Sequence, residues 1–229
     1  MRLNIKELLD FFDGKKDSQK GDANSLMAIL GEDLNVAIYK DFRKNKVEVL
    51  EDSVLTGLKK GKRLDRWVLD GKKLYQCEIK NWAATAIGGK KLEAEADPKE
   101  IKEVSSYHWE RELKTNLSDE ADYPNGVNKV LGKMKPPVKC ESFNVEPLLI
   151  YWMPITADSN GLDPLSVLSL KTLPNLAKNT KFSKLDIFSA SLYLRQLYKQ
   201  GKGQKFIDLD LPNFNRRLKL LTKLTSGDK

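Results

Sequence analysis

The sequence has few of the residues on which disulfide-rich, zinc-knuckle or histidine-dependent proteins rely. Its 229 residues include two cysteines, Cys77 and Cys140, and one histidine, His108. Two cysteines this far apart give neither a disulfide framework nor a paired zinc knuckle. A lone histidine without a Ser or Cys partner motif argues against triad-type catalysis. We therefore expect an inert buried thiol at Cys77 and a packed, hydrogen-bonded His108.

Long hydrophobic runs are also missing. The longest apolar run, residues 148–155, has eight residues, whereas a membrane helix needs about 20. We therefore expect no membrane partner. Residues 1–7 contain no sustained apolar stretch, and together with the low cysteine content this predicts a reduced, cytoplasmic setting. The motifs GxxxxGK[ST] and GxGxxG are absent, which argues against a nucleotide-driven motor.

Positive charge is in excess, and it is concentrated near the C-terminus. The formal net charge is +8 and the pI is about 9.2. Residues 171–229 hold 13 Lys and Arg against four Asp and no Glu, a net charge of +9, so residues 1–170 are close to neutral. A basic segment favours a polyanionic partner. We expect DNA, with RNA not excluded.

Strand patterns cluster in two parts of the chain. Residues 46–50 alternate apolar and charged side chains, and residues 63–69 and 72–80 are β-prone runs separated by Asp70-Gly71, a strong hairpin signal. Residues 147–155 are continuously apolar, which is typical of a central strand covered on both faces.

Helix patterns flank these strands. Residues 24–42 carry an apolar stripe that includes Leu26 and Ile29. Asp97-Pro98-Lys99-Glu100 supplies an N-cap, a proline at the first helical position and an acidic third residue, which predicts a helix over 98–117. Residues 183–200 read as a helix, although their apolar residues also suit a strand, and 206–211 as a short strand. A basic helix is expected over 213–224.

The length and the ordinary globular composition favour one domain with an extension. We expect an N-terminal helix and loop over 1–23, a core over 24–156, and a basic C-terminal extension over 157–229 packed on that core. The expected fold class is α/β, with a central mixed four-stranded sheet flanked by helices in the order α-β-β-β-α-β.

The hairpin brings two carboxylates to one face. If Asp70 and Gly71 form a two-residue turn, Asp65 lies opposite Gln76; if the turn spans residues 70–73, Asp65 lies opposite Glu78. Side chains alternate along a strand, so Asp65, Glu78 and Lys80 share a face in either register. The simplest alternative is an exposed hairpin with ordinary surface charges.

Two carboxylates held together in a sheet repel each other and need a cation or a shared proton. Magnesium is bound in proteins by one or two carboxylates together with waters and substrate phosphates. A lysine two residues after Glu78 would stand beside such an ion, where it could orient water or stabilise charge on a phosphate. The pattern therefore predicts a Mg²⁺ site, in which Mn²⁺ can substitute.

With Asp65, Glu78-Ile79-Lys80 and this order of elements, the chain resembles the PD-(D/E)XK, or restriction-endonuclease-like, nucleases over about residues 24–155. The resemblance implies a restriction-endonuclease-like core and a metal-dependent endodeoxyribonuclease. It implies catalytic and metal-binding roles for Asp65 and Glu78, a metal-binding carbonyl at Ile79, a catalytic Lys80, and an acidic residue from the first helix, for which Glu32 matches best. Leu64 replaces the nominal proline before the aspartate. The resemblance also implies a homodimer, which is common among restriction enzymes that cut both strands.

Basic residues outside this motif are candidates for phosphate contacts, because backbone contacts position nucleic acids. The simpler interpretation is that these residues form a solvated basic turn or helix face without contacting nucleic acid. These candidates are Lys59, Lys60, Lys62, Arg63, Arg216 and Arg217.

We therefore expect a Mg²⁺-dependent nuclease that hydrolyses phosphodiester bonds of DNA. Two alternatives stay open: a non-catalytic nucleic-acid-binding module of the same fold, and a subunit of a larger nucleic-acid-processing complex. Salt-sensitive DNA binding without product would identify the former.

Overall fold

The computed structural model describes residues 1–14, 20–50, 65–84, 88–114, 130–132, 134–157, 162–170, 182–201 and 205–211, and residues 215, 216, 219, 220, 222 and 223. Its helical elements are α1 (Ile5–Phe12), α2 (Lys20–Phe42), α4 (Pro98–His108), the π-helical turn η3 (Trp109–Lys114), the 3-10 turn η5 (Val138–Cys140) and α5 (Ala190–Gln200). Its strands are β1 (Arg2–Asn4), β2 (Val47–Leu50), β3 (Arg66–Asp70), β4 (Lys73–Lys80), β5 (Asn144–Tyr151), β6 (Leu165–Ser169), β7 (Lys184–Ser189) and β8 (Phe206–Asp208).

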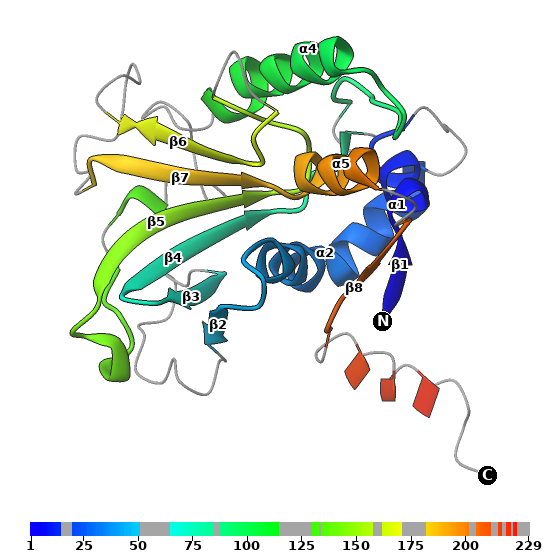
Figure 1. Ribbon diagram of the computed structural model, residues 1–229. Coiled ribbons are helices and arrows are strands. Elements are labelled where there is room, and N and C mark those ends of the chain that lie inside the picture. The colour runs from blue at the N-terminus through cyan, green and yellow to red at the C-terminus, as the bar shows by residue number, and fades with distance from the viewer. Residues whose placement is uncertain are drawn as a thin grey trace.

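The centre of the fold is a mixed six-stranded sheet in the order β2-β3-β4-β5-β7-β6 (Figure 1). β4, β5 and β7 run parallel, and the remaining neighbours are antiparallel. The expected α/β class with a helix-flanked mixed sheet is confirmed. The expected number of four strands is wrong, because β6 and β7 extend the sheet and both come from the segment after residue 157.

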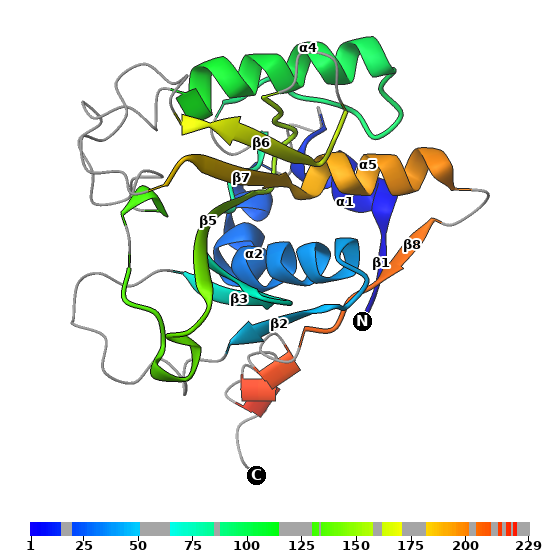
Figure 2. The same cartoon turned by 60° about the vertical axis from the view of Figure 1, so that its left-hand side comes forward.

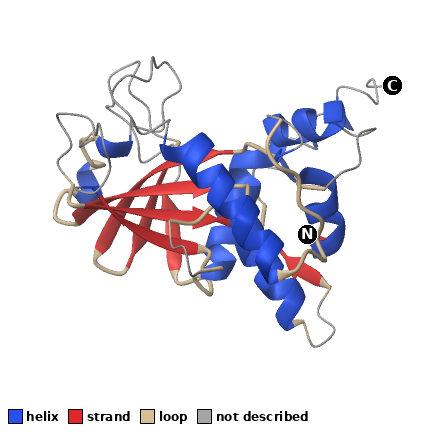
Figure 3. Ribbon diagram, turned by 90° about the horizontal axis from the view of Figure 1, so that it is seen from above, coloured by secondary structure: helices blue, strands red, loops and turns tan. Residues whose placement is uncertain are grey.

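Helices lie on both sides of the sheet. β6 and β7 lie between α4 and α2 in two views (Figures 1 and 2). From above, helices gather over the sheet and beyond one end of its strands (Figure 3). In the parallel strands β4, β5 and β7, this is the carboxyl end, where the last residues of β4 and β5 meet.

The predicted central strand is confirmed as β5. Its last six residues are buried, and it is hydrogen-bonded to β4 on one side and β7 on the other. The strand begins at Asn144 and ends at Tyr151, three residues before Pro154, rather than spanning 147–155. A continuous apolar run identifies a buried strand, but it does not mark where the ladder ends.

The helix predicted over 183–200 is wrong in its first part, where the chain forms strand β7 before α5. Leu185, Ile187 and Phe188 are at most 1 % exposed in the sheet, so they form part of a strand buried on both faces. Ser189 separates the two elements, because its hydroxyl accepts a hydrogen bond from the Leu192 amide at 3.2 Å and caps the helix.

The helix predicted over 24–42 is confirmed as α2, which begins at Lys20 rather than at residue 24. Its expected apolar stripe is wrong at the N-terminal half, where Leu26 and Ile29 are 40 % and 46 % exposed. The buried side of that half is formed instead by Ala23 and Met27, which are four residues apart and therefore lie on one face.

The predicted helix from residue 98 is confirmed as α4. Asp97 caps it by accepting a hydrogen bond from the Glu100 amide at 2.8 Å. The helix continues as the π-helical turn η3 to Lys114, and residues 115–117 lie outside the described residues. The predicted strand over 206–211 is present as β8, paired with β1, and the helix predicted over 213–224 lies largely outside the described residues.

A buried ion pair joins the N-terminal helix to α5. The Asp13 carboxylate accepts hydrogen bonds from Arg195 Nη2 at 3.2 Å, from Trp152 Nε1 at 3.0 Å and from the Ser191 hydroxyl. Asp13 is fully buried and Arg195 is 1 % exposed. Buried charges stay ionised only when they are paired and hydrogen-bonded, so this network fixes α1 against the sheet end.

No helix in the described part of the chain has the length and apolar character that crossing a membrane requires.

Replacing Arg195 with Met should lower the free energy of unfolding by about 3–5 kcal/mol, because it leaves the Asp13 carboxylate buried without its cation. The matched control is Lys114→Met, which breaks an exposed ion pair with Glu110 on η3 and should cost at most about 0.5 kcal/mol. Urea unfolding followed by circular dichroism measures both values. Equal losses in the two variants would contradict the structural role of the Asp13–Arg195 pair.

Candidate functional site

The β3–β4 hairpin places Asp65 beside Glu78. The ladder runs from Asp70 opposite Lys73 to Arg66 opposite Cys77. Gly71 has a positive φ of 59°, which a tight hairpin turn requires. Continued by one residue, the register sets Asp65 opposite Glu78, as in the second of the two predicted registers.

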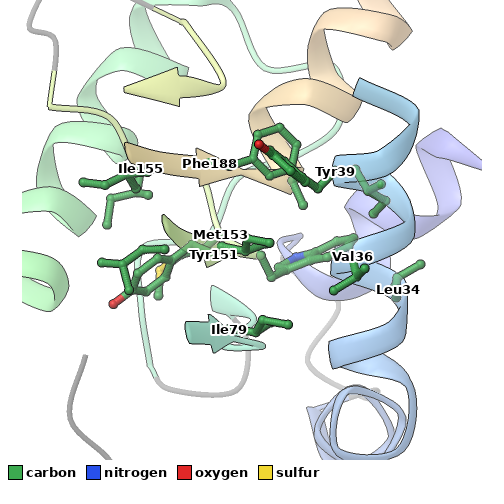
Figure 4. Close-up of a cluster of buried hydrophobic side chains, with 14 of the residues drawn as sticks. Leu34, Val36, Tyr39, Ile79, Tyr151, Met153, Ile155 and Phe188 are labelled. Carbon is green, nitrogen blue, oxygen red and sulfur yellow. The ribbon is translucent and has the colours of Figure 1, made fainter. Parts of the chain in front are cut away.

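Glu78 and Lys80 form a buried ion pair at the end of β4. Lys80 Nζ lies 2.7 Å from Glu78 Oε1, and the two residues are 8 % and 1 % exposed. They share one face of the strand because side chains alternate. Ile79 points to the other face, toward α2, which supplies Val36 on the side nearer the sheet (Figure 4). The predicted proximity of the carboxylate and the ammonium group is therefore present.

Gln76 fixes the same face of β4 further along the strand. Its side-chain nitrogen donates to the carbonyls of Val130 and of Gly132, the latter at 2.8 Å, and its side-chain oxygen accepts from the Met134 amide at 3.2 Å. Val130, Gly132 and Met134 are thereby held against β4, and the polar face continues from Gln76 to Lys80.

Asp65 contacts the backbone of β4 directly. Its Oδ2 accepts a hydrogen bond from the Ile79 amide at 2.8 Å, and the residue is half-buried. The carboxylate therefore lies at the end of the hairpin, next to the peptide that joins Glu78 to Ile79. The metal-binding role of the Ile79 carbonyl stays a prediction.

Glu32 reaches this end of the hairpin from α2, but its carboxylate contacts an arginine. Arg66 Nη2 lies 3.3 Å from Glu32 Oε2 and 3.2 Å from Asp33 Oδ1, and Arg66 Nη1 donates to the Asp65 carbonyl at 2.7 Å. Arg66 thus connects the acidic residues of α2 to the start of β3. A metal-binding role for Glu32 stays a prediction, and it requires Glu32 to leave Arg66.

A close approach between α2 and the end of β4 determines where Glu32 lies. A Cβ added at Gly31 would meet Asn81 Cγ at 2.5 Å and Cβ at 2.6 Å. The Asn35 side chain donates to the Gly31 carbonyl at 2.9 Å, and Asn81 donates to the Met27 carbonyl at 3.4 Å. Glycine is required at position 31, because any side chain there would separate α2 from β4.

Tyr151, Trp82 and Glu112 also belong to this site, and they were not predicted as functional residues. Tyr151 is the ladder partner of Lys80 and is fully buried. Its ring meets the Trp82 ring edge-on at 6.1 Å, and Lys80 Nζ lies 5.8 Å from the Trp82 ring centroid. Trp82 therefore packs against the sheet.

The surroundings of Tyr151 keep its hydroxyl protonated. Burial raises the pKa of Tyr151 well above its ordinary value, and the negative charges of Glu112 and Glu78 raise it further. Glu112 comes from η3, and π-helical turns occur frequently at functional sites. Tyr151 lies beside Lys80 because β5 pairs with β4. The register of two strands so far apart in the chain cannot be read from a single sequence, so Tyr151 was not predicted.

His108 and Cys77 have the structural roles expected of them. His108 is fully buried, with Nδ1 2.9 Å from the Pro154 carbonyl, and burial lowers its pKa. Cys77 is fully buried on the face of β4 opposite Glu78, and burial raises the pKa of its thiol.

Asp65 and Glu78 supply the donor chemistry that magnesium requires, namely carboxylate oxygens from one or two residues. Among the described residues, no group of three or more His, Cys, Asp or Glu side chains is arranged to hold a metal ion. A metal here would therefore draw on the carboxylates of Asp65 and Glu78 and would need further oxygen ligands to complete its coordination.

Most of the basic residues predicted to contact nucleic acid lie outside the described part of the chain. Lys59, Lys60, Lys62, Arg63 and Arg217 lie outside the described residues, and Arg216 is exposed. Their roles stay predictions.

Comparison of the chain with protein-family models, with curated proteins and with solved structures gives no match.

Gly31→Ala should lower the free energy of unfolding by about 1–3 kcal/mol, because the new methyl group overlaps Asn81. Gly21→Ala on the same helix is the matched control. It has open space around it and should raise stability by up to about 1 kcal/mol through helix propensity.

Asn81→Gly in the Gly31→Ala background should recover part of the loss, since it removes the atoms that the methyl group meets. Chemical denaturation of the unaltered chain, Gly31→Ala, Asn81→Gly and the double variant gives the coupling energy. Additive effects of the two substitutions would contradict the close contact.

Proposed function

We propose that the chain is a metal-dependent nuclease that hydrolyses phosphodiester bonds of DNA, with a restriction-endonuclease-like core. One observation carries the proposal: Asp65, Glu78 and Lys80 meet at the end of the β3–β4 hairpin, with the ion pair of Glu78 and Lys80 buried. Asp65 and Glu78 are proposed to hold Mg²⁺, with Glu32 and the Ile79 carbonyl as further ligands.

The cost of burial supports a functional reading of this pair. Removing a carboxylate and an ammonium group from water costs several kcal/mol per ion even after relaxation. An exposed hairpin with surface charges would avoid that cost, but Glu78 is only 1 % exposed. The arrangement is explained when the pair serves a reaction that needs charges in a site with little water.

The topology also supports the proposal. The order in the chain is α2, then the antiparallel strands β2, β3 and β4, then α4, then β5 parallel to β4. This is the α-β-β-β-α-β order on which the resemblance to restriction-endonuclease-like nucleases rests. Asp65 lies at the open end of the β3–β4 hairpin, away from the turn. This is also the carboxyl end of β4, where Glu78 lies.

Each residue has a separate role in the proposed reaction. Bound Mg²⁺ supplies a Lewis acid and favours the ionisation of water. The carboxylates of Asp65 and Glu78 would bind the metal at the open end of the β3–β4 hairpin. Lys80 turns its ammonium group from Glu78 to the phosphate, where it orients the water or stabilises the added negative charge.

The net charge of +9 in residues 171–229 supports a polyanionic substrate. We also propose that the chain acts as a homodimer, because two copies on one DNA duplex would allow cleavage of both strands. One observation favours non-catalytic DNA binding as a second candidate: in this structure Glu32 contacts Arg66 and Glu78 contacts Lys80.

Lys80→Met should lower the rate of DNA cleavage in Mg²⁺ by about 100- to 1,000-fold, because it removes a charge that stabilises the transition state. The assay uses supercoiled plasmid and labelled DNA and RNA oligonucleotides, each with Mg²⁺, Mn²⁺ or chelator. Lys73→Met is the matched control, since Lys73 lies at the opposite end of β4 and pairs with Glu146 at 3.1 Å. It should cleave like the unaltered chain.

Lys80→Met leaves the Glu78 carboxylate buried without Lys80, so loss of folding must be separated from loss of chemistry. The double variant Glu78→Gln/Lys80→Met removes both charges and should fold while remaining inactive. Cleavage that survives both the chelator and the double substitution would rule out the proposed mechanism. Salt-sensitive DNA binding without product in the unaltered chain would identify the non-catalytic alternative.

A further inference from the structure

Tyr151 lies on the charged face of β4, and its hydroxyl makes no hydrogen bond within the part of the chain that the structure describes. It is the last residue of β5 and pairs with Lys80 in the parallel ladder, while Leu149 pairs with Glu78. Neighbouring strands are about 4.8 Å apart and paired residues point to the same face. Figure 4 shows the Tyr151 ring directed away from α2, whereas Ile79 points toward it.

The hydroxyl of Tyr151 is buried and has no hydrogen-bond partner among the described residues. A phenol at this depth normally finds a partner, since burying an unbonded hydroxyl destabilises the folded state. Phenylalanine would fill the same space without that cost. The hydroxyl therefore calls for an explanation other than packing.

The charges around Tyr151 define what its hydroxyl can do. The carboxylates of Glu78 and Glu112 both raise the pKa of Tyr151, in addition to the effect of burial. Glu78 lies two residues before Lys80, the ladder partner of Tyr151, on the same face of β4, so a phenol on that face is placed to donate a hydrogen bond to the Glu78 carboxylate. In this structure Lys80 Nζ already contacts Glu78 Oε1 at 2.7 Å.

The inference that follows rests on the proposed function, in which Lys80 turns from Glu78 to the phosphate. We propose that Tyr151 is a positioning residue of this site, and that its hydroxyl donates a hydrogen bond to the Glu78 carboxylate when the Lys80 ammonium group leaves it. Carboxylates that bind metals are themselves held by hydrogen bonds, and loss of such a partner costs about 10- to 100-fold in metal affinity or activity. Tyr151 thus keeps Glu78 oriented while Lys80 acts on the substrate.

Tyr151→Phe tests this role, because it removes only the hydroxyl. The matched control is Tyr75→Phe. Tyr75 is a buried tyrosine on the same sheet, but it faces α2 and donates a hydrogen bond to Asp186 Oδ2 at 3.0 Å. Three quantities are measured for the full chain: the thermal unfolding midpoint, the Mn²⁺ affinity by electron paramagnetic resonance without nucleic acid, and kcat and KM for DNA cleavage in Mg²⁺.

Tyr151→Phe should leave the unfolding midpoint unchanged or higher, weaken Mn²⁺ binding by about 10- to 100-fold and lower kcat with little change in KM. Tyr75→Phe should show the reverse pattern, with a lower midpoint and unchanged Mn²⁺ affinity, because its hydroxyl stabilises the fold. A structural hydroxyl at position 151 would instead lower the midpoint and leave Mn²⁺ affinity unchanged.

The two proposals can fail separately. If the unaltered chain binds Mn²⁺ and cleaves DNA, and Tyr151→Phe matches it in both, the role of Tyr151 is overturned and the nuclease function stands. If Mn²⁺ binds and Tyr151→Phe weakens it, but no substrate is cleaved, the role of Tyr151 at Glu78 stands and the nuclease function falls. If the unaltered chain binds no Mn²⁺ and cleaves nothing, both proposals fall.

Discussion

The buried contact between Glu78 and Lys80 is the constraint on which the site depends. Both charges project from one face of β4, and β3 and β5 on either side limit their access to water. Such a pair persists only where the surrounding structure holds it. Gln76 anchors the same face to Val130, Gly132 and Met134, and Tyr151 packs beside Lys80. The stability of the sheet therefore supports the electrostatics of the site.

Helix α2 brings acidic residues to the same end of the hairpin by two separate contacts. Arg66 bridges from β3 to Glu32 and Asp33, and Gly31 allows the helix to approach Asn81, the residue after β4. The first contact is electrostatic and the second is steric. Together they place carboxylates from the helix and the hairpin around one strand end, where Arg66 and Lys80 supply compensating positive charge in this structure.

Local patterns predicted the parts of the fold that depend on neighbouring residues. The Asp70-Gly71 hairpin, the cap at Asp97 and the apolar run of β5 were all readable, because each depends on a few adjacent side chains. The division of 183–200 at Ser189 was missed, since strand and helix patterns overlap there. Arg66 and Tyr151 were missed because their partners come from distant segments, and only strand and helix packing brings them together.

In the proposed metal site, Asp65 and Glu78 hold one metal ion between them beside Lys80. The most direct measurement is a crystal structure of the chain soaked in Mn²⁺, with anomalous diffraction recorded near the manganese edge. One strong anomalous peak is expected in contact with both carboxylates, with the Lys80 ammonium group displaced from Glu78. An Mn²⁺-soaked crystal with no peak at these carboxylates, and with Lys80 still in contact with Glu78, would contradict it.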